Sequence, residues 1–198
     1  MLNASGVADV IDFAFHPWGN AYYATKHCGA GPYDPDQRHC WFNTCVKSTS
    51  PPADCFGTIV AQHGDEEKHV NIIEACAIKH YPKWTIYWPF VQCAEANYES
   101  GEQSLGACAT KTGLDFAALD SCAAGAEGAE AALVQAKATP DHLGVPYLLV
   151  NGQPLVDGQR LDNPTQLLRT VCTAYTGEAP QGCKELAVAD DTKVEIIV

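Results

Sequence analysis

Ten cysteines are the residues of this 198-residue chain best suited to chemistry. A cysteine can act as a nucleophilic thiolate, a metal ligand or half of a disulfide, and its spacing from other cysteines helps to separate these uses. Thiol–disulfide exchange needs a thiolate of lowered pKa and a second thiol close by, commonly in a Cys-x-x-Cys pair. The sequence has no such pair, and Cys40 and Cys45, with four residues between them, come nearest. The cysteines therefore predict a disulfide framework made in an oxidising compartment.

A zinc site is the alternative use for the cysteines of the first third of the chain. Its candidate ligands are His27, Cys28, His39, Cys40, Cys45, Cys55 and His63. These residues lack the short Cys-x-x-Cys spacing of structural zinc sites, and the four cysteines can all pair with one another. We therefore expect disulfides here, and the sequence implies no metal and no organic cofactor.

The remaining cysteines follow the predicted helices. Cys172 and Cys183 flank the end of the last helix and predict a local disulfide. Two of the three cysteines Cys93, Cys108 and Cys122 are expected to pair, and the third to reach Cys76. Sequence alone leaves this connectivity open.

Several elements must position these residues. Residues 10–15, with the sequence VIDFAF, predict a buried strand, and residues 26–56 predict a Cys-rich loop insertion. Acidic residues followed by apolar residues at helical spacing predict a helix over residues 64–80, which Pro82 ends. The Ala-rich residues 114–137 predict one or two helices. The conformation of residues 84–93, rich in aromatic side chains, stays open.

The last third has the clearest pattern. Residues 145–150 predict a strand, Asn151-Gly152 a type I′ turn, and residues 153–156 a returning edge strand. A helix with Asn163 as N-cap and Pro164 in its first turn follows. A hairpin followed by a helix is how a thioredoxin-like domain ends, although many α/β folds contain it.

Composition narrows the class of protein. The chain is 46% hydrophobic and 18% charged, which is typical of a globular protein. Its formal net charge of −12 disfavours binding to nucleic acid, and no apolar run is long enough for a membrane span. Asn3-Ala4-Ser5 matches an N-glycosylation sequon, and the N-terminal residues lack the features of a signal peptide.

One group of residues resembles the signature of a known protein family. Its residues, in order within a single stretch, are Gln62, His63, Gly64, Glu67, Asn71 and Cys76. This stretch resembles the signature of the gamma-interferon-inducible lysosomal thiol reductase (GILT) family. Three more segments agree in order: PWGNA at residues 17–21, VPYLLVNGQPL at residues 145–155, and the closing helix that leads to the last two cysteines. The resemblance covers about residues 10–183, and four collinear motifs are more specific than one.

The resemblance implies an α/β, thioredoxin-like fold with a helical insertion. We expect the domain over residues 1–183, with insertions at 26–56 and about 64–138, and a tail at 184–198. The family's Cys-x-x-Cys belongs on the first strand-to-helix turn, before VIDFAF, so the first strand and most of the first helix are expected to be missing. Ala61 and Lys68 stand where the family has two more cysteines, which are expected to bridge each other.

The implied activity is reduction of protein disulfides at acidic pH, in the lysosome or outside the cell. Val145 and Pro146, joined by a cis peptide bond in the family's fold, would face the redox cysteines and the substrate. His63 is interpreted as a polar residue at the helix entry rather than as an acid–base residue. We expect the chain to be an N-terminally truncated, inactive form of the enzyme. The alternative is a secreted, non-catalytic, disulfide-rich binding protein on the same scaffold.

Overall fold

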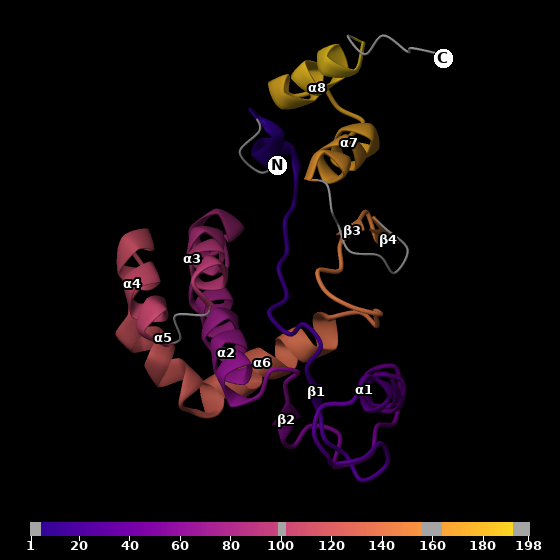
Figure 1. Ribbon diagram of the computed structural model, residues 1–198, viewed down its shortest axis with the longest axis vertical. Coiled ribbons are helices and arrows are strands. Elements are labelled where there is room, and N and C mark those ends of the chain that lie inside the picture. The colour runs from indigo at the N-terminus through magenta and orange to yellow at the C-terminus, as the bar shows by residue number, and fades with distance from the viewer. Residues whose placement is uncertain (1–4, 99–101, 156–163, 192–198) are drawn as a thin grey trace, which may run out of the picture. The chain divides into compact units, whose positions relative to one another are not determined.

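The computed structural model describes residues 5–98, 102–155 and 164–191 of the chain. It divides into two compact units, one formed by residues 14–141 and the other by residues 1–13 with 142–198. The described residues form eight α-helices and two separate two-stranded antiparallel sheets (Figure 1). The predicted α/β class is thus confirmed only in the coarse sense of a helix-rich fold with small sheets.

Five helices make up most of the larger unit. They are α2 (Asp65–His80), α3 (Trp84–Ala96), α4 (Glu102–Thr112), α5 (Phe116–Ala123) and α6 (Ala126–Ala138). Helix α2 packs against α5 and α6, and α3 runs beside α4 (Figure 1). Their apolar faces enclose a core that includes Ile73, Phe90 and Leu119, each with no exposed surface. Burial of these faces, more than helix propensity, stabilises such helices.

The predicted helix over residues 64–80 is confirmed as α2. The Ala-rich segment forms two helices, α5 and α6, separated by Ala124 and Gly125. Gly128 allows this corner to lie against α2, because a Cβ there would come within 2.9 Å of Ile72 Cγ2 and 2.7 Å of the Cys122 carbonyl oxygen. Residues 84–93, left open by the sequence, begin α3 and carry Pro89 inside the helix.

The Cys-rich segment is more regular than a loop insertion. It contains α1 (Pro35–Trp41), which continues into a π-helical turn, η2 (Phe42–Val46). Asp34 caps α1 by accepting a hydrogen bond from the Asp36 N–H at 2.8 Å. Strands β1 (Tyr22–Tyr23) and β2 (Ile59–Val60) pair antiparallel on either side of the segment. Buried aromatic side chains allow these helical turns to form, and composition alone did not reveal them.

The expected strand at residues 10–15 is wrong. Val10 ends a 3-10 helix, η1 (Val7–Val10), and residues 11–15 join no ladder among the described residues. The backbone is extended at Ile11, and the Phe15 N–H donates to the Tyr87 hydroxyl at 3.3 Å. No described strand lies alongside these residues, so their apolar pattern has no sheet to enter.

The smaller unit holds the hairpin and the last two helices. Leu149–Val150 (β3) pairs with Gln153–Pro154 (β4), a shorter strand than the sequence predicted. The turn residues Asn151 and Gly152 have φ of 51° and 75°, so the predicted type I′ geometry is confirmed.

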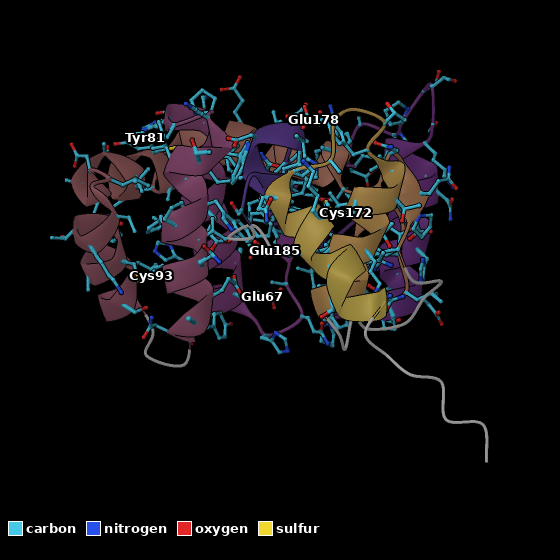
Figure 2. The ribbon with its side chains drawn as sticks, turned by 90° about the horizontal axis from the view of Figure 1, so that it is seen from above. Glu67, Tyr81, Cys93, Cys172, Glu178 and Glu185 are labelled. Carbon is cyan, nitrogen blue, oxygen red and sulfur yellow. A yellow bond between two sulfur atoms is a disulfide. The ribbon has the colours of Figure 1, made fainter. Side chains whose placement is uncertain are left out.

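Helices α7 (Pro164–Ala174) and α8 (Gln181–Asp191) complete this unit. Cys172 lies on α7, and Glu178 and Glu185 lie in the following turn and on α8 (Figure 2). Glu178 pairs with Lys184 at 3.4 Å, and the Gly182 N–H donates to the Ser5 carbonyl oxygen at 2.7 Å. The predicted N-cap Asn163, the sequon at residues 3–5 in its first two positions and the apolar end of the tail lie outside the described residues. None of the described helices is long and apolar enough to cross a membrane.

Candidate functional site

The family signature forms the entrance to helix α2. Gly64 is the N-cap with φ of 87°, a conformation that glycine adopts without strain. Glu67, the third residue of the helix, turns back so that its Oε2 accepts the His63 backbone N–H at 2.6 Å. The same oxygen lies 3.0 Å from His63 Nδ1. The signature therefore builds a helix cap in which a side chain of the first turn satisfies a backbone donor just outside the helix.

The two side chains of this cap differ in burial. The Glu67 side chain is 14% exposed, whereas the His63 ring is 66% exposed. Gln62 joins a second motif, because its Oε1 accepts from Asn20 Nδ2 at 2.7 Å. Two segments of the family resemblance thus meet in space. The geometry gives His63 a place at the helix entry, as interpreted from the sequence.

The rest of the signature lies along α2. Asn71 is half-buried one turn after Glu67, and Cys76 is fully buried. Ala61 and Lys68 occupy the positions where the family has two further cysteines. Ala61 is buried beside the Cys-rich segment, and Lys68 pairs with Asp65 across the first turn of the helix.

All ten cysteines are joined in disulfides, and none is free. The pairs are Cys28–Cys40, Cys45–Cys55, Cys76–Cys122, Cys93–Cys108 and Cys172–Cys183. Disulfide sulfurs carry no thiolate, so no cysteine of the chain in this state can attack a substrate. Among the histidines of the considered zinc site, His39 donates from Nδ1 to Asp141 Oδ1 at 2.7 Å.

The chain is similar to a known protein family and to proteins named after it. A family model described as "Gamma interferon inducible lysosomal thiol reductase (GILT)" matches residues 44–112. An Arabidopsis thaliana protein named "Gamma-interferon-responsive lysosomal thiol protein" is 30% identical over 136 residues, which are 66% of this chain and 55% of that protein. A Mus musculus protein named "Gamma-interferon-inducible lysosomal thiol reductase" is 32% identical over 133 residues, 64% of this chain and 50% of that one.

The resemblance to the GILT family is confirmed. The chain spans about half the length of the curated relatives it matches. The GILT match from residue 44 to residue 112 runs from η2 through α4, so it includes the helix entrance and the whole of α2.

The segment around residue 145, which resembles a GILT motif in sequence, lies in the smaller unit. The Val145–Pro146 peptide bond is cis, and the Val145 side chain is 48% exposed. Tyr147 stacks on His142 with ring centroids 5.5 Å apart, which fixes the segment on one side. The exposed Val145 side chain, just before the hairpin, is therefore accessible to a ligand.

A buried acid within the GILT match is the residue that sequence reasoning missed. Glu74 lies in the core of the larger unit with no exposed surface, and neither of its carboxylate oxygens has a hydrogen-bond partner among the residues that the structure describes. Burial raises the pKa of Glu74 well above its ordinary value, and the neighbouring Glu95 on α3 raises it further. Burial also raises the pKa of Glu95. The signal was available, since Glu74 falls on the apolar stripe of α2 between Val70 and Ala77.

Proposed function

We propose that this chain is part of a thiol-disulfide oxidoreductase of the lysosomal thiol reductase type, which reduces protein disulfides at acidic pH. The GILT family-model match over the helix entrance and α2 carries the proposal, and the 32% identity to a Mus musculus protein named a thiol reductase supports it. The five disulfides suit a protein of the secretory pathway, either lysosomal or extracellular.

The proposal assigns the redox cysteines to sequence outside this chain. The ten cysteines present are all paired, and none is in a Cys-x-x-Cys arrangement. In the complete enzyme, a thiolate at a helix N-terminus would attack the substrate disulfide and a second thiol would release the product. No metal and no organic cofactor are needed for this exchange.

The proposed fold is a thioredoxin-like domain over residues 1–183, interrupted by the Cys-rich insertion 26–56 and the helical insertion of about 64–138. Val145 and Pro146 would form the wall opposite the redox cysteines. The exposed Val145 supports this assignment, because its backbone and side chain can meet an extended substrate segment. The substrates would be disulfide-containing proteins.

Two forms of the protein test this proposal. Reading the gene upstream of Met1 should reveal an in-frame Cys-x-x-Cys, and a disulfide-reduction assay at acidic pH should detect activity only in the longer product. A Cys-x-x-Cys to Ser-x-x-Ser variant of the longer form is the control and should be inactive. Activity in the 198-residue chain would refute the assignment. A stop codon next to Met1, with an inactive chain, would favour the non-catalytic binding protein.

A further inference from the structure

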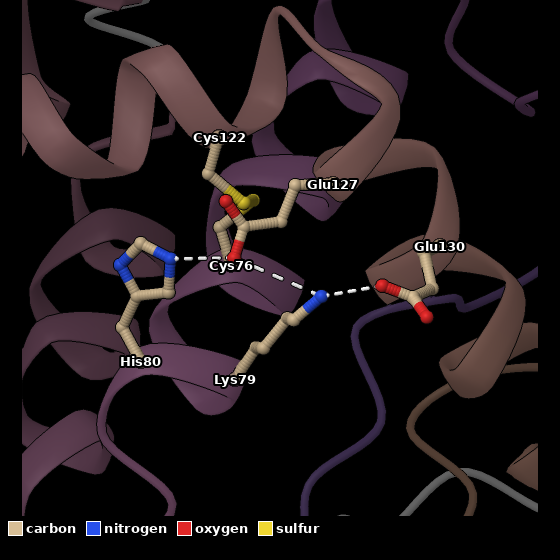
Figure 3. Close-up of polar contacts among 6 residues, drawn as sticks. All are labelled: Cys76, Lys79, His80, Cys122, Glu127 and Glu130. Carbon is tan, nitrogen blue, oxygen red and sulfur yellow. Dashed lines mark hydrogen bonds and ion pairs between the residues drawn. A yellow bond between two sulfur atoms is a disulfide. The ribbon is translucent and has the colours of Figure 1, made fainter.

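Beyond the proposed reductase function, we propose that reduction of the Cys76–Cys122 disulfide creates a zinc site whose ligands are Cys76, Cys122, His80 and Glu127. The cluster lies where the C-terminal half of α2 meets the corner between α5 and α6 (Figure 3). It includes Cys76, the last residue of the family signature, but none of the cap residues His63, Gly64 and Glu67 and neither Val145 nor Pro146.

The ligand atoms are already close together. One ligand atom each of His80, Cys122 and Glu127 lies within 4.8 Å of the others. His80 Nε2 and Glu127 Oε1 are 3.0 Å apart. Cys76 supplies the fourth atom, because its sulfur is bonded to that of Cys122. Two sulfurs, one imidazole nitrogen and one carboxylate oxygen form a ligand set that tetrahedral zinc accepts.

Helix geometry explains this convergence. Cys76 and His80 are four residues apart on α2, so their side chains share one face of the helix. Cys122 lies in the last turn of α5, and Glu127 lies in the first turn of α6. The close approach at Gly128 brings this corner onto that face of α2. Each side of the contact therefore contributes two ligands.

The surrounding charges leave Glu127 available. Lys79 Nζ lies 2.6 Å from Glu130 Oε2 but 3.7 Å from Glu127 Oε1, so Glu130 is its nearer partner (Figure 3). The His80 and Glu127 side chains are 26% and 45% exposed, whereas Cys76 and Cys122 are buried. A metal ion would enter from the exposed His80–Glu127 side and meet the sulfurs inside.

The switch requires reduction, because sulfurs within a disulfide are poor zinc ligands. Two molecules of a thiol reductant would supply two electrons and two protons, which gives two cysteine thiols and one disulfide of the reductant. Zn²⁺ would then displace the two thiol protons and bind both thiolates with neutral His80 and the Glu127 carboxylate. The metal would replace a covalent link between α2 and α5 with a coordinate one.

Cobalt titration of the whole chain tests the site. We would reduce all disulfides, remove the reductant without oxygen, add Co²⁺ and record its thiolate charge-transfer and d–d absorption, then displace it with Zn²⁺. The expected result is one tetrahedral equivalent in the reduced chain that is absent from the oxidised chain. The variant Cys76→Ser/Cys122→Ser should lose that equivalent. The variant Cys93→Ser/Cys108→Ser, which removes the other disulfide of the five-helix region, between α3 and α4, should keep it.

The two non-sulfur ligands separate a built site from thiols that bind metal in an unfolded chain. His80→Gln and Glu127→Gln should each weaken Zn²⁺ binding by at least tenfold, and Glu130→Gln should not. Circular dichroism should show that Zn²⁺ restores helix to the reduced chain. The proposal is overturned if either ligand variant binds like the wild type, if both cysteine-pair variants behave alike, or if the reduced chain stays unfolded with Zn²⁺. None of these readouts depends on reductase activity.

Discussion

Two regions of the larger unit are held together in different ways. The helical region, residues 65–138, packs five helices around a core of aliphatic and aromatic side chains. The Cys-rich region, residues 18–60, has only two-residue strands and short helical turns around a core dominated by aromatic side chains. Each region contains two disulfides. The helical region closes loops of 46 and 15 residues, and the Cys-rich region closes loops of 12 and 10.

The difference concerns what the disulfides add. Helices α2 to α6 satisfy their own backbone hydrogen bonds and bury a continuous core, so cross-links there reinforce a structure that packing already defines. The Cys-rich region has few backbone ladders, and its fold depends on ring packing around Trp41 together with the short cross-links. The longer disulfide loops thus occur in the region that packing already stabilises, and the shorter ones in the region with little secondary structure.

Loss of a central aromatic side chain should produce the largest effect. Trp41 is 2% exposed, donates from Nε1 to the Cys55 carbonyl oxygen at 3.0 Å, and contacts Trp18, Tyr23 and Phe56. Trp41→Ala should lower the free energy of unfolding by about 3–5 kcal/mol. Denaturant unfolding measures the loss in the free energy of unfolding, and hydrogen exchange shows which residues lose protection.

The matched variant for Trp41→Ala is Phe90→Ala in the helical region. Phe90 has no exposed surface, and its truncation should cost a similar amount, about 3–5 kcal/mol. Trp41→Ala should raise exchange mainly in residues 18–60, and Phe90→Ala mainly in α2 to α6. Equal loss of protection throughout both regions for each variant would show that the two regions unfold as one.

The stability lost on removing a single disulfide should increase with the length of the loop that the disulfide closes. In the chain-entropy description, Cys76→Ala/Cys122→Ala loses about 4 kcal/mol and Cys45→Ala/Cys55→Ala about 3 kcal/mol, because the closed loops differ in length. Thermal unfolding of the two oxidised variants measures this difference. The comparison adds a qualitative expectation, since only the second variant should lose near-UV signal from the aromatic core at low temperature. The reverse ranking would mean that the short loops do more than constrain the unfolded chain.

Sequence reasoning succeeded where local pattern decides structure. Helix α2 followed from its acidic first turn and apolar stripe, and the hairpin followed from Asn151-Gly152. It failed where a distant partner decides. The VIDFAF pattern requires a neighbouring strand, and the aromatic-rich start of α3 folds as a helix because the core accepts Tyr87 and Phe90.

The candidate site follows the same division. The helix-entrance residues were found from their resemblance to the family signature, and the cap that they form involves only neighbouring residues of the chain. Glu74 and the meeting of His80 with Glu127 were missed. The burial of Glu74 and the contact between His80 and Glu127 both arise from packing between helices. Such packing cannot be predicted from the sequence of one segment.

Acidity should stabilise the helical region through Glu74. The folded protein holds the Glu74 proton to higher pH than the unfolded chain does, because its pKa is raised by burial and by Glu95. The folded state thus binds more protons between the unfolded and folded pKa values, and stability falls as pH rises through that window. For one proton the slope is at most about 1.4 kcal/mol per pH unit. Below the unfolded pKa both states are protonated, so this stabilisation is fully present and no longer changes with pH.

The variant Glu74→Gln removes this titration while keeping a neutral side chain of similar shape. Urea unfolding from pH 4 to pH 8 should show a smaller decline in stability for Glu74→Gln than for the wild type. Glu95→Gln should reduce the decline as well, because it removes one raised pKa and the repulsion that Glu95 exerts on Glu74. Identical pH profiles for wild type and Glu74→Gln would contradict the role of the buried acid. If Glu74→Gln changed the pH dependence of stability only in the Cys-rich region, the buried acid would not act on the helical region as we expect.

The smallest expected effect lies at the helix entrance, where the two regions join. Glu67→Ala removes the acceptor of the His63 N–H and should cost about 1 kcal/mol. Glu67→Gln is the matched control, because an amide oxygen can still accept that hydrogen bond, and it should cost less. His63→Ala should cost least, since its ring is 66% exposed and its backbone N–H remains. If His63→Ala lowers the free energy of unfolding as much as Glu67→Ala, the imidazole itself stabilises the helix entrance. His63 would then be the first residue to test for an acid–base role.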